Sequence, residues 1–409
     1  LSLMDYSSGD IVSAGMDRDL WVAGAAADDR MRFEYGYDPQ PDPRSDEELW
    51  RDIGPYWPYI KNIGSGYLVQ KALRLLCDTD DINADTIPHI RKCLESWRDN
   101  SSYEDMIREK AKIDLVIGVT FDMDENPNTP LTKKHLYTDI YTGIQNRRQL
   151  YRLEQLSGKE IYSLHTYVDA LDTFIDRQIE KGAIGFKWHF YPYMRPMTFD
   201  LADSFAAEKA LDKLLLLPPR GATGSAVNVG FDEMEPLHNY LQHHLLRRAA
   251  AQRLPIQIHT GTFGGTLGGH LDYSNPSHLV DTFKRYPQIN FNILHSSFPY
   301  QREAGELARI FPNVFVNATW VDTLSPMAFR ADLKEWLTYI PLNKIIAFGS
   351  DQFSPTLTWA SAENTRDLMS YVLADLIEEG YFTEKDARFA ADRVLRSNAL
   401  SFYGANRLS

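Results

Sequence analysis

Residues 255–261 have the sequence Pro-Ile-Gln-Ile-His-Thr-Gly, and the pattern of this stretch decides the fold. A short apolar, β-rich run ends in a histidine and is followed by a turn. Residues 289–295, 314–318 and 345–349 show the same kind of run, and amphipathic stretches such as 277–286 separate them. Buried strands that alternate with amphipathic helices are typical of βα units, whose parallel strands are covered on both faces. The carboxyl half therefore predicts a parallel α/β sheet.

Upstream, the same rhythm continues with longer connections. Residues 114–120 and 183–189 predict strands, and residues 137–142 predict a weaker one. This makes about seven strands, whereas a closed barrel of this kind needs eight. We therefore expect a (β/α)8 TIM-type barrel whose first strand lies upstream of Leu1 or is missing, since the deficit falls at the amino end.

Two stretches interrupt the βα rhythm. Residues 45–112 carry many aromatic side chains at partly helical spacing and predict a helical insertion near the N-terminus. Residues 211–230 contain Pro218 and Pro219 together with glycines, and predict an inserted loop. Such loops on the carboxyl face of a barrel usually build or cover the site. We expect residues 1–409 to form a single barrel domain that carries both interruptions.

The composition is that of an ordinary globular protein with an acidic surface. The chain has 409 residues, with 43 basic and 56 acidic side chains and a net charge of −13. This charge disfavours nucleic acid and anionic lipid as partners, and no apolar run of about 18 residues predicts a membrane span. Cys77 and Cys93 lie in a helical region, where we expect two buried thiols and a cytoplasmic, reducing location.

Three polar residues stand where buried parallel strands end. They are His259, His295 in Phe-Asn-Ile-Leu-His-Ser-Ser, and Asp351 in Ile-Ala-Phe-Gly-Ser-Asp. Barrels place catalytic groups at this carboxyl face. Imidazole and carboxylate are also the ligands that suit zinc, manganese or iron at an open site. One such histidine alone indicates a structural residue, but three instances at successive strand ends predict a metal centre.

These motifs resemble the amidohydrolase superfamily. The match includes His-Thr-Gly at 259–261, Leu-His-Ser at 294–296, Asn-Val-Phe-Val-Asn at 313–317 and Gly-Ser-Asp at 349–351. The chain is most similar to the amidohydrolase-related branch, which contains uronate isomerase and the barrel domain fused to glutamine-synthetase-like proteins. The resemblance covers roughly the last 230 residues well and the amino-terminal part, from Asp10-Ile-Val-Ser-Ala-Gly onward, more weakly.

The resemblance implies roles for the three strand-end residues. His259 would be a metal ligand, Asp351 a metal ligand and general base, and His295 a second-metal ligand or a catalytic contact to substrate and transition state. The family also has a His-x-His at the end of its first strand, which this chain lacks and which the pattern would put just before Leu1. The implied cofactor is a divalent ion, zinc first, with manganese or iron as alternatives.

Residues near the end of the strand at 183–189 are candidates for binding substrate. Lys187 has three open interpretations: a carboxylated, metal-bridging lysine as in some relatives, a clamp for a substrate carboxylate, or a structural ion pair, because a buried ammonium needs an anionic partner. His189 should share its face of the strand. Tyr193 and Arg195 match a Tyr-x-Arg-Pro element of the branch, where Arg195 would grip a carboxylate or remain a solvated loop residue.

The predicted function is therefore that of a metal-dependent enzyme on a small, carboxylate-bearing substrate. Trp320 would either line the site or pack in the core. Hydrolysis is the first choice, and decarboxylation or sugar-acid isomerisation on the same barrel are the alternatives, because fold alone does not select the reaction. A metal-free barrel that only binds a ligand is the rival from another class. Assembly into a homo-oligomer is left open.

Overall fold

A computed structural model describes residues 19, 23, 45–100, 103–218, 227–263, 270–352 and 354–408. Its residue contacts divide the chain into two compact units. Unit 1 contains residues 1–114, 263–268 and 317–398, and unit 2 contains residues 115–262, 269–316 and 399–409. The expectation of a single barrel domain stays a prediction.

The strands form one sheet in chain order, from β1 to β7. Each of the five neighbouring pairs from β1 to β6 is parallel. The strands are β1 Val116–Thr120, β2 Thr132–Tyr137, β3 Phe186–Trp188, β4 Ile256–Ile258, β5 Phe291–Ile293, β6 Val314–Asn317 and β7 Ile345–Ile346. This order is that of successive βα units, and it confirms the parallel α/β sheet that the apolar runs predict.

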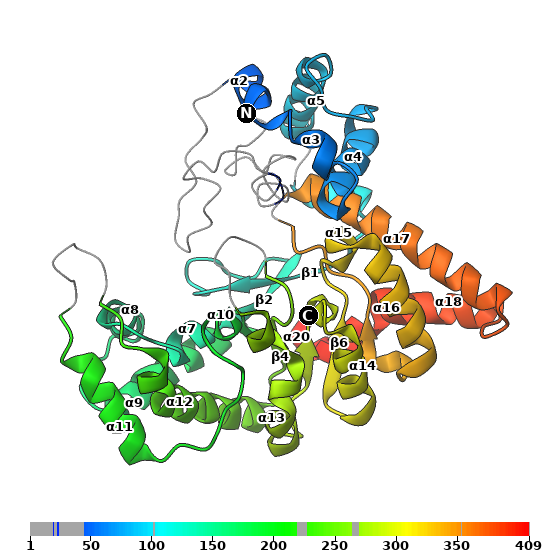
Figure 1. The fold of residues 1–409 in the computed structure, drawn as a ribbon. Helices are drawn as coiled ribbons and strands as arrows, with labels where there is room; N and C mark the ends of the chain where they lie inside the picture. The colour runs from blue at the N-terminus through cyan, green and yellow to red at the C-terminus, as the bar shows by residue number, and fades with distance from the viewer. Residues whose placement is uncertain are drawn as a thin grey trace. The chain divides into compact units, whose positions relative to one another are not determined.

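In unit 2, helices connect the strands (Figure 1). They are α7 Asp139–Thr142, α8 Arg147–Ser157, α9 Leu164–Glu180, α10 Tyr191–Met194, α11 Ser204–Leu215, α12 Phe231–Gln252, α13 Val280–Arg285 and α14 Gln301–Ile310. Ser163 caps α9, where its hydroxyl accepts the backbone N–H of Thr166. The apolar face of α9 is buried, with Leu171 and Ile175 fully enclosed. This amphipathic burial is the main stabilisation of such a helix.

In unit 1, the stretch 45–112 is largely helical, as its spacing predicts. Its helices are α2 Asp46–Ile53, α3 Trp57–Ile60, α4 Gly64–Cys77, α5 Ile87–Asn100 and α6 Tyr103–Asp105, followed by the π-helix Met106–Lys110. Unit 1 also contains α15 Val321–Leu324, α16 Pro326–Tyr339, α17 Pro355–Glu378 and α18 Glu384–Asp392. Buried side chains of α4, including Leu68 and Leu73, share a core with Leu357 and Ala360 of α17.

Cys77 and Cys93 form a disulfide, so the expectation of two free thiols is wrong. Cys77 is the last residue of α4, and Cys93 lies within α5. Their Cα atoms are 5.7 Å apart, a separation that a disulfide spans readily. Periodicity within each helix cannot show that the two helices bring these positions together. The cytoplasmic location, which rested partly on free thiols, stays a prediction.

Two further boundaries differ from the sequence expectations. Residues 139–142 form helix α7, and the strand lies earlier, at Thr132–Tyr137. The sequence pattern did not predict this strand, because two lysines interrupt its apolar residues. Lys134 is nevertheless buried, and its Nζ atom donates to the backbone oxygen of Asn126 at 3.1 Å. In the expected loop 211–230, residues 211–215 instead complete α11. Residues 219–226 of that loop, like the Asp10-Ile-Val-Ser-Ala-Gly motif, lie outside the described residues.

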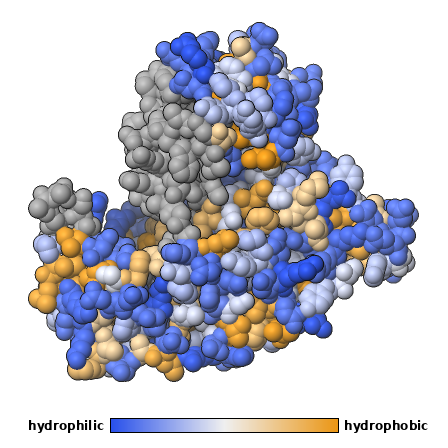
Figure 2. Space-filling model, viewed as in Figure 1, coloured by the Kyte–Doolittle hydropathy of each residue, from blue (hydrophilic) through white to orange (hydrophobic). Residues whose placement is uncertain are grey.

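Among the described residues, no helix is both long enough and apolar enough to cross a membrane. Apolar side chains nevertheless reach the surface in places (Figure 2). Around α11, the side chains of Leu201, Phe205 and Leu216 are exposed.

Candidate active site

His259 and His295 lie together at the carboxyl ends of β4 and β5 in unit 2. The Nδ1 atom of His259 is 3.0 Å from the Nε2 atom of His295, and the two rings are 4.2 Å apart. Both side chains are buried. The two strands pair in register, with Ile258 opposite Ile293, so the residues that follow them emerge at the same edge. The pairing of these two histidines therefore follows directly from the parallel sheet.

Hydrogen bonds and a glycine hold the two strand ends in contact. The hydroxyl of Thr260 donates to the Leu294 carbonyl at 2.9 Å and lies 2.7 Å from the Ser297 hydroxyl. Gly261 has φ +74°, and a Cβ there would lie 2.3 Å from the Phe298 carbonyl oxygen. The backbone N–H of Thr262 donates to that same oxygen at 2.6 Å. Only glycine fits such a close approach of two backbone segments.

The turn that carries His295 has an uncommon backbone conformation. His295, Ser296 and Ser297 have φ of +63°, +50° and +54°. Non-glycine residues rarely adopt the left-handed region, and such residues cluster at functional sites, where packing enforces them. All three side chains are buried, which indicates that the surrounding structure fixes the position of the imidazole.

The hydrogen-bond partners of His259 define its tautomer. Its Nε2 atom lies 3.0 Å from the Thr262 carbonyl oxygen. Because a carbonyl accepts only, Nε2 carries the hydrogen, and Nδ1 presents a lone pair towards His295. Burial, together with the neighbouring His295 and His189, holds the pKa of His259 well below its usual range. The ring is therefore neutral, which is the form that binds a metal ion.

Lys187 and His189 lie at the end of β3 in the same unit. Lys187 is buried and pairs in register with Tyr137 of β2 and Gln257 of β4. The ring of His189 is 4.7 Å from that of His259, nearly perpendicular to it. Burial, and then the nearby Lys187 charge, keep the pKa of His189 well below its usual range. The structure thus brings His189 next to the histidine pair.

Asp139, at the start of α7, is a residue that the sequence analysis missed. Its Oδ2 atom accepts the backbone N–H of His189 at 2.5 Å, of Phe190, and of Tyr191 at 3.3 Å. The side chain is fully buried, and burial raises its pKa to about 6 despite these hydrogen bonds. One carboxylate therefore fixes the turn that carries His189. The signal was absent from the sequence because donor and acceptor are about 50 positions apart.

Arg195 is neither solvated nor unpaired, so the interpretation as a solvated loop residue is wrong. Its guanidinium is buried and donates to Glu235 Oε1 at 2.5 Å and to the Thr198 carbonyl at 2.7 Å. The Glu235 carboxylate on α12 compensates the charge, which allows the burial. Tyr193 lies in α10, and its side chain is outside the described part of the chain.

Trp320 and Asp351 belong to unit 1. Both adopt positive φ, +69° and +52°. The backbone N–H of Trp320 donates to the Gly349 carbonyl at 2.7 Å. The side-chain amide of Gln352 donates to the Thr323 hydroxyl at 3.2 Å. Asp351 is exposed and Trp320 is half-buried. Hydrogen bonds within unit 1 thus join the loop after β7 to the segment after β6.

The donor set of unit 2 fits part of a metal site. The Nδ1 atom of His259 and the Nε2 atom of His295 are 3.0 Å apart. The Nε2–H of His259 donates to a backbone carbonyl, an arrangement that is common around metal-binding histidines. Within the described residues, however, no group of three or more His, Cys, Asp or Glu side chains is arranged to hold an ion. Two imidazoles alone do not complete such a site.

A family model described as amidohydrolase matches residues 172–405, which is more than half of the chain. The chain therefore belongs to the amidohydrolase family, and the resemblance inferred from its strand-end motifs is confirmed. This places it in a superfamily of enzymes.

The chain is similar to one curated protein and to several solved structures. It is 30% identical over 205 residues to protein fluG of Emericella nidulans, a match that covers 49% of this chain and 24% of that protein. Uronate isomerase from Thermotoga maritima has a TM-score of 0.70 at 15% identity, covering 88% of this chain and 83% of that one.

Glucuronate isomerase from Caulobacter crescentus also gives a TM-score of 0.70 at 15% identity, over 94% of this chain and 84% of that one. At these identities the likeness shows the fold alone, and it supports an α/β barrel. The chain spans about a quarter of the length of the curated relative.

Proposed function

We propose that this chain is a metal-dependent hydrolase that acts on a small, carboxylate-bearing substrate. The observation that carries the proposal is the pair His259–His295, whose ring nitrogens converge at 3.0 Å in a chain of the amidohydrolase family. Here the Nδ1 lone pair of one ring faces the Nε2 atom of the other.

In this proposal His259 and His295 hold a divalent ion, zinc in the first place and manganese or iron as alternatives. Such an ion lowers the pKa of bound water or polarises a substrate oxygen. By the family resemblance, Asp351 of unit 1 would accept and release a proton as general base. The roles of His295 as a catalytic contact and of Asp351 as ligand and base come from the family resemblance.

Substrate binding is assigned to Lys187, which would hold a substrate carboxylate through its ammonium group. His189, beside His259, would contact the same substrate. Tyr193, Arg195 and Trp320 are proposed as further contacts, although the pairing of Arg195 with Glu235 already supplies a structural reason for its charge. The cytoplasmic location and a homo-oligomeric state stay predictions.

The metal role is tested by measuring metal content and turnover together. The full-length protein is stripped with a chelator, reloaded with zinc or manganese, and assayed on N-acyl amino acids, aromatic carboxylates and sugar acids. His259→Ala should lose bound metal and activity. His165→Ala, which removes an exposed histidine of α9, should lose neither. Metal-independent turnover, or equal metal content in both variants, contradicts the proposal.

The panel also separates the reactions. Release of an amine or alcohol identifies hydrolysis, whereas loss of carbon dioxide or an aldose-to-ketose change would identify the lyase or isomerase. Asp351→Asn should reduce turnover by about 10²–10⁴-fold. Lys187→Met should mainly raise KM, because a carboxylate clamp acts already in the ground state.

A further inference from the structure

Three neighbouring strands of unit 2 each place an aromatic side chain at their carboxyl end. Phe121 follows β1, Tyr137 is the last residue of β2, and Phe190 lies two residues after β3. The rings of Phe121 and Tyr137 are stacked at 4.6 Å, and Phe190 is 5.7 Å from Tyr137 and 6.3 Å from Phe121. We call these three side chains the aromatic wall. They form one continuous apolar surface rather than scattered residues.

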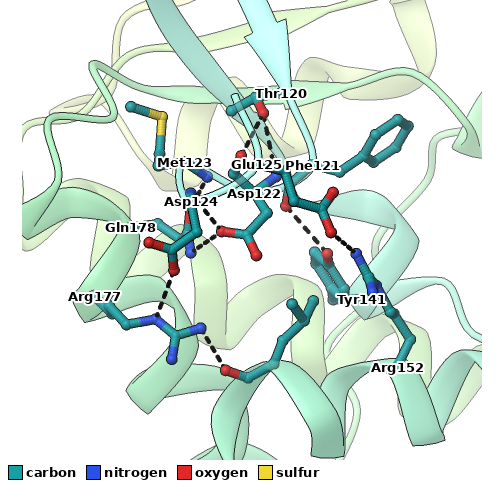
Figure 3. A network of polar contacts seen from close by, with 11 residues as sticks. Thr120, Phe121, Asp122, Met123, Asp124, Glu125, Tyr141, Arg152, Arg177 and Gln178 are labelled. Atoms are coloured by element: carbon teal, nitrogen blue, oxygen red, sulfur yellow. Dashed lines mark hydrogen bonds and ion pairs between the residues drawn. The ribbon is translucent and has the colours of Figure 1, made fainter. Parts of the chain in front are cut away.

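The wall is held by polar groups beneath it. Figure 3 shows that the Tyr141 hydroxyl donates to the Phe121 carbonyl, at 3.2 Å, while the Phe121 ring points away from this contact. The Thr120 hydroxyl donates to the Asp122 carbonyl at 2.8 Å, and Gln178 donates to the buried Asp122 carboxylate at 2.9 Å. These bonds fix the backbone on both sides of Phe121, and its ring is ordered by stacking on Tyr137.

Phe190 is fixed in a comparable way. Its backbone N–H donates to Asp139, the same buried carboxylate that binds the N–H of His189. The positions of Phe190 and of His189 are therefore set by one group. This rigidity matters because a preorganised surface loses little conformational freedom when a ligand binds.

The wall is continuous with the candidate active site. The ring centroid of His189 lies 5.1 Å from that of Phe190, 5.9 Å from that of Tyr137 and 4.7 Å from that of His259. Lys187 pairs in register with Tyr137. Phe121 remains 39% exposed. An apolar ring surface, a buried ammonium and a histidine pair thus follow one another along the carboxyl ends of five adjacent strands, β1 to β5.

We propose that the aromatic wall binds the ring of an aromatic carboxylate, which is then the substrate class of this enzyme. The proposal rests on the proposed function and makes it specific. A planar ring gains contact area and favourable offset or edge-to-face geometry against Phe121, Tyr137 and Phe190, and Lys187 matches the carboxylate charge. A sugar acid would instead lose hydrogen bonds from several hydroxyls to water against three rings.

The test measures binding, which needs no turnover. Phenylacetate, cyclohexylacetate and gluconate are titrated into the full chain by calorimetry, since all three carry one carboxylate. Phenylacetate should bind more tightly than gluconate by at least tenfold. Phe121→Leu should weaken phenylacetate by about 3–10-fold, the loss of one aromatic pair, and leave gluconate unchanged. Phe121→Tyr keeps the ring and should retain the affinity.

Phe205→Leu is the matched control, because it removes an exposed phenylalanine of α11 from the same unit. It should not change any affinity. The inference is overturned if gluconate binds as tightly as phenylacetate, or if Phe121→Leu and Tyr137→Leu both leave phenylacetate unchanged. Ring-dependent binding without metal-dependent turnover would uphold the inference and refute the hydrolase proposal. Metal-dependent hydrolysis of the N-acyl amino acids without ring-dependent binding would refute the inference and uphold the hydrolase proposal.

Discussion

Each unit of this enzyme contains a fully buried carboxylate shortly after a strand, and the two differ in what they bind. Asp139 in unit 2 accepts three backbone N–H groups from residues 189–191. Asp322 in unit 1 accepts the Ser361 hydroxyl at 2.8 Å, while Asn364 donates to its backbone carbonyl at 3.0 Å. Asp139 therefore fixes a backbone turn, and Asp322 fixes helix α15 against α17.

Both carboxyl groups have a raised pKa, and burial is the main cause in each. Burial raises the pKa of Asp139 to about 6 and that of Asp322 to about 7. In each case hydrogen bonds oppose the effect of burial. Three backbone N–H groups bind one oxygen of Asp139, whereas a side-chain hydroxyl binds Asp322. Burial outweighs the hydrogen bonds at both carboxyl groups, so both pKa values are raised.

The largest expected effect comes from removing each carboxylate. Asp139→Ala leaves three backbone N–H groups without their acceptor, at about 1–3 kcal/mol for each fully buried group. We expect a loss of about 3–5 kcal/mol, against about 1–3 kcal/mol for Asp322→Ala. Urea unfolding measures both, with Asp212→Ala, an exposed position on α11, as the control. Equal losses at the two sites would show that donor number does not matter.

The pH dependence separates the two groups further. A carboxyl group whose folded pKa lies above its unfolded value of 3.8 stabilises the fold below that value. This contribution is lost as the pH rises through the folded pKa, about 6 for Asp139 and about 7 for Asp322. Between pH 6 and 7 only Asp322 should still respond. Buried histidines such as His135, whose pKa burial lowers to about 3, act in the opposite sense.

The experiment therefore compares wild type with Asp322→Asn, so that the histidine contributions cancel. The stability advantage of wild type over Asp322→Asn should fall by about 1 kcal/mol from pH 6 to pH 7. The same difference taken with Asp139→Asn should change mainly below pH 6. Identical pH profiles for the two differences would refute the assigned order of the pKa values.

The contrast between the two carboxylates also marks what the sequence could predict. Apolar runs such as residues 255–259 predicted strands because parallel strands are buried on both faces, and His259 and His295 were found because they end such runs. The strand Thr132–Tyr137 was misplaced because Lys133 and Lys134 break the apolar pattern. Local patterns report burial along one element and carry no information on its partners.

For the same reason, no local sequence pattern predicted the structural roles of Asp139 and Asp322. Each acquires its role from residues about 40 to 50 positions away. The disulfide Cys77–Cys93 and the ion pair Arg195–Glu235 were missed in the same way, since each joins two separate helices or turns. Strand-end motifs are the exception, because parallel topology alone brings their side chains to one edge.

The smallest expected effect comes from tuning a donor rather than removing the acid. Ser361→Ala takes away the hydroxyl that donates to Asp322 Oδ2, so the pKa of Asp322 should rise further. The loss should be about 1 kcal/mol at pH 5, where the carboxyl group is protonated, and larger at pH 8, since hydrogen bonds to a charged group contribute about 1.5–3 kcal/mol. Ser370→Ala is the control, because this exposed hydroxyl of α17 donates to the Asp367 carbonyl within its own helix. A loss of stability that is the same at both pH values would show that Ser361 does not stabilise the ionised form.

Asp139 admits no such variant, because its donors are backbone amides. No side-chain substitution removes a single donor to Asp139, and this distinguishes a carboxylate that fixes a backbone turn from one that binds side chains.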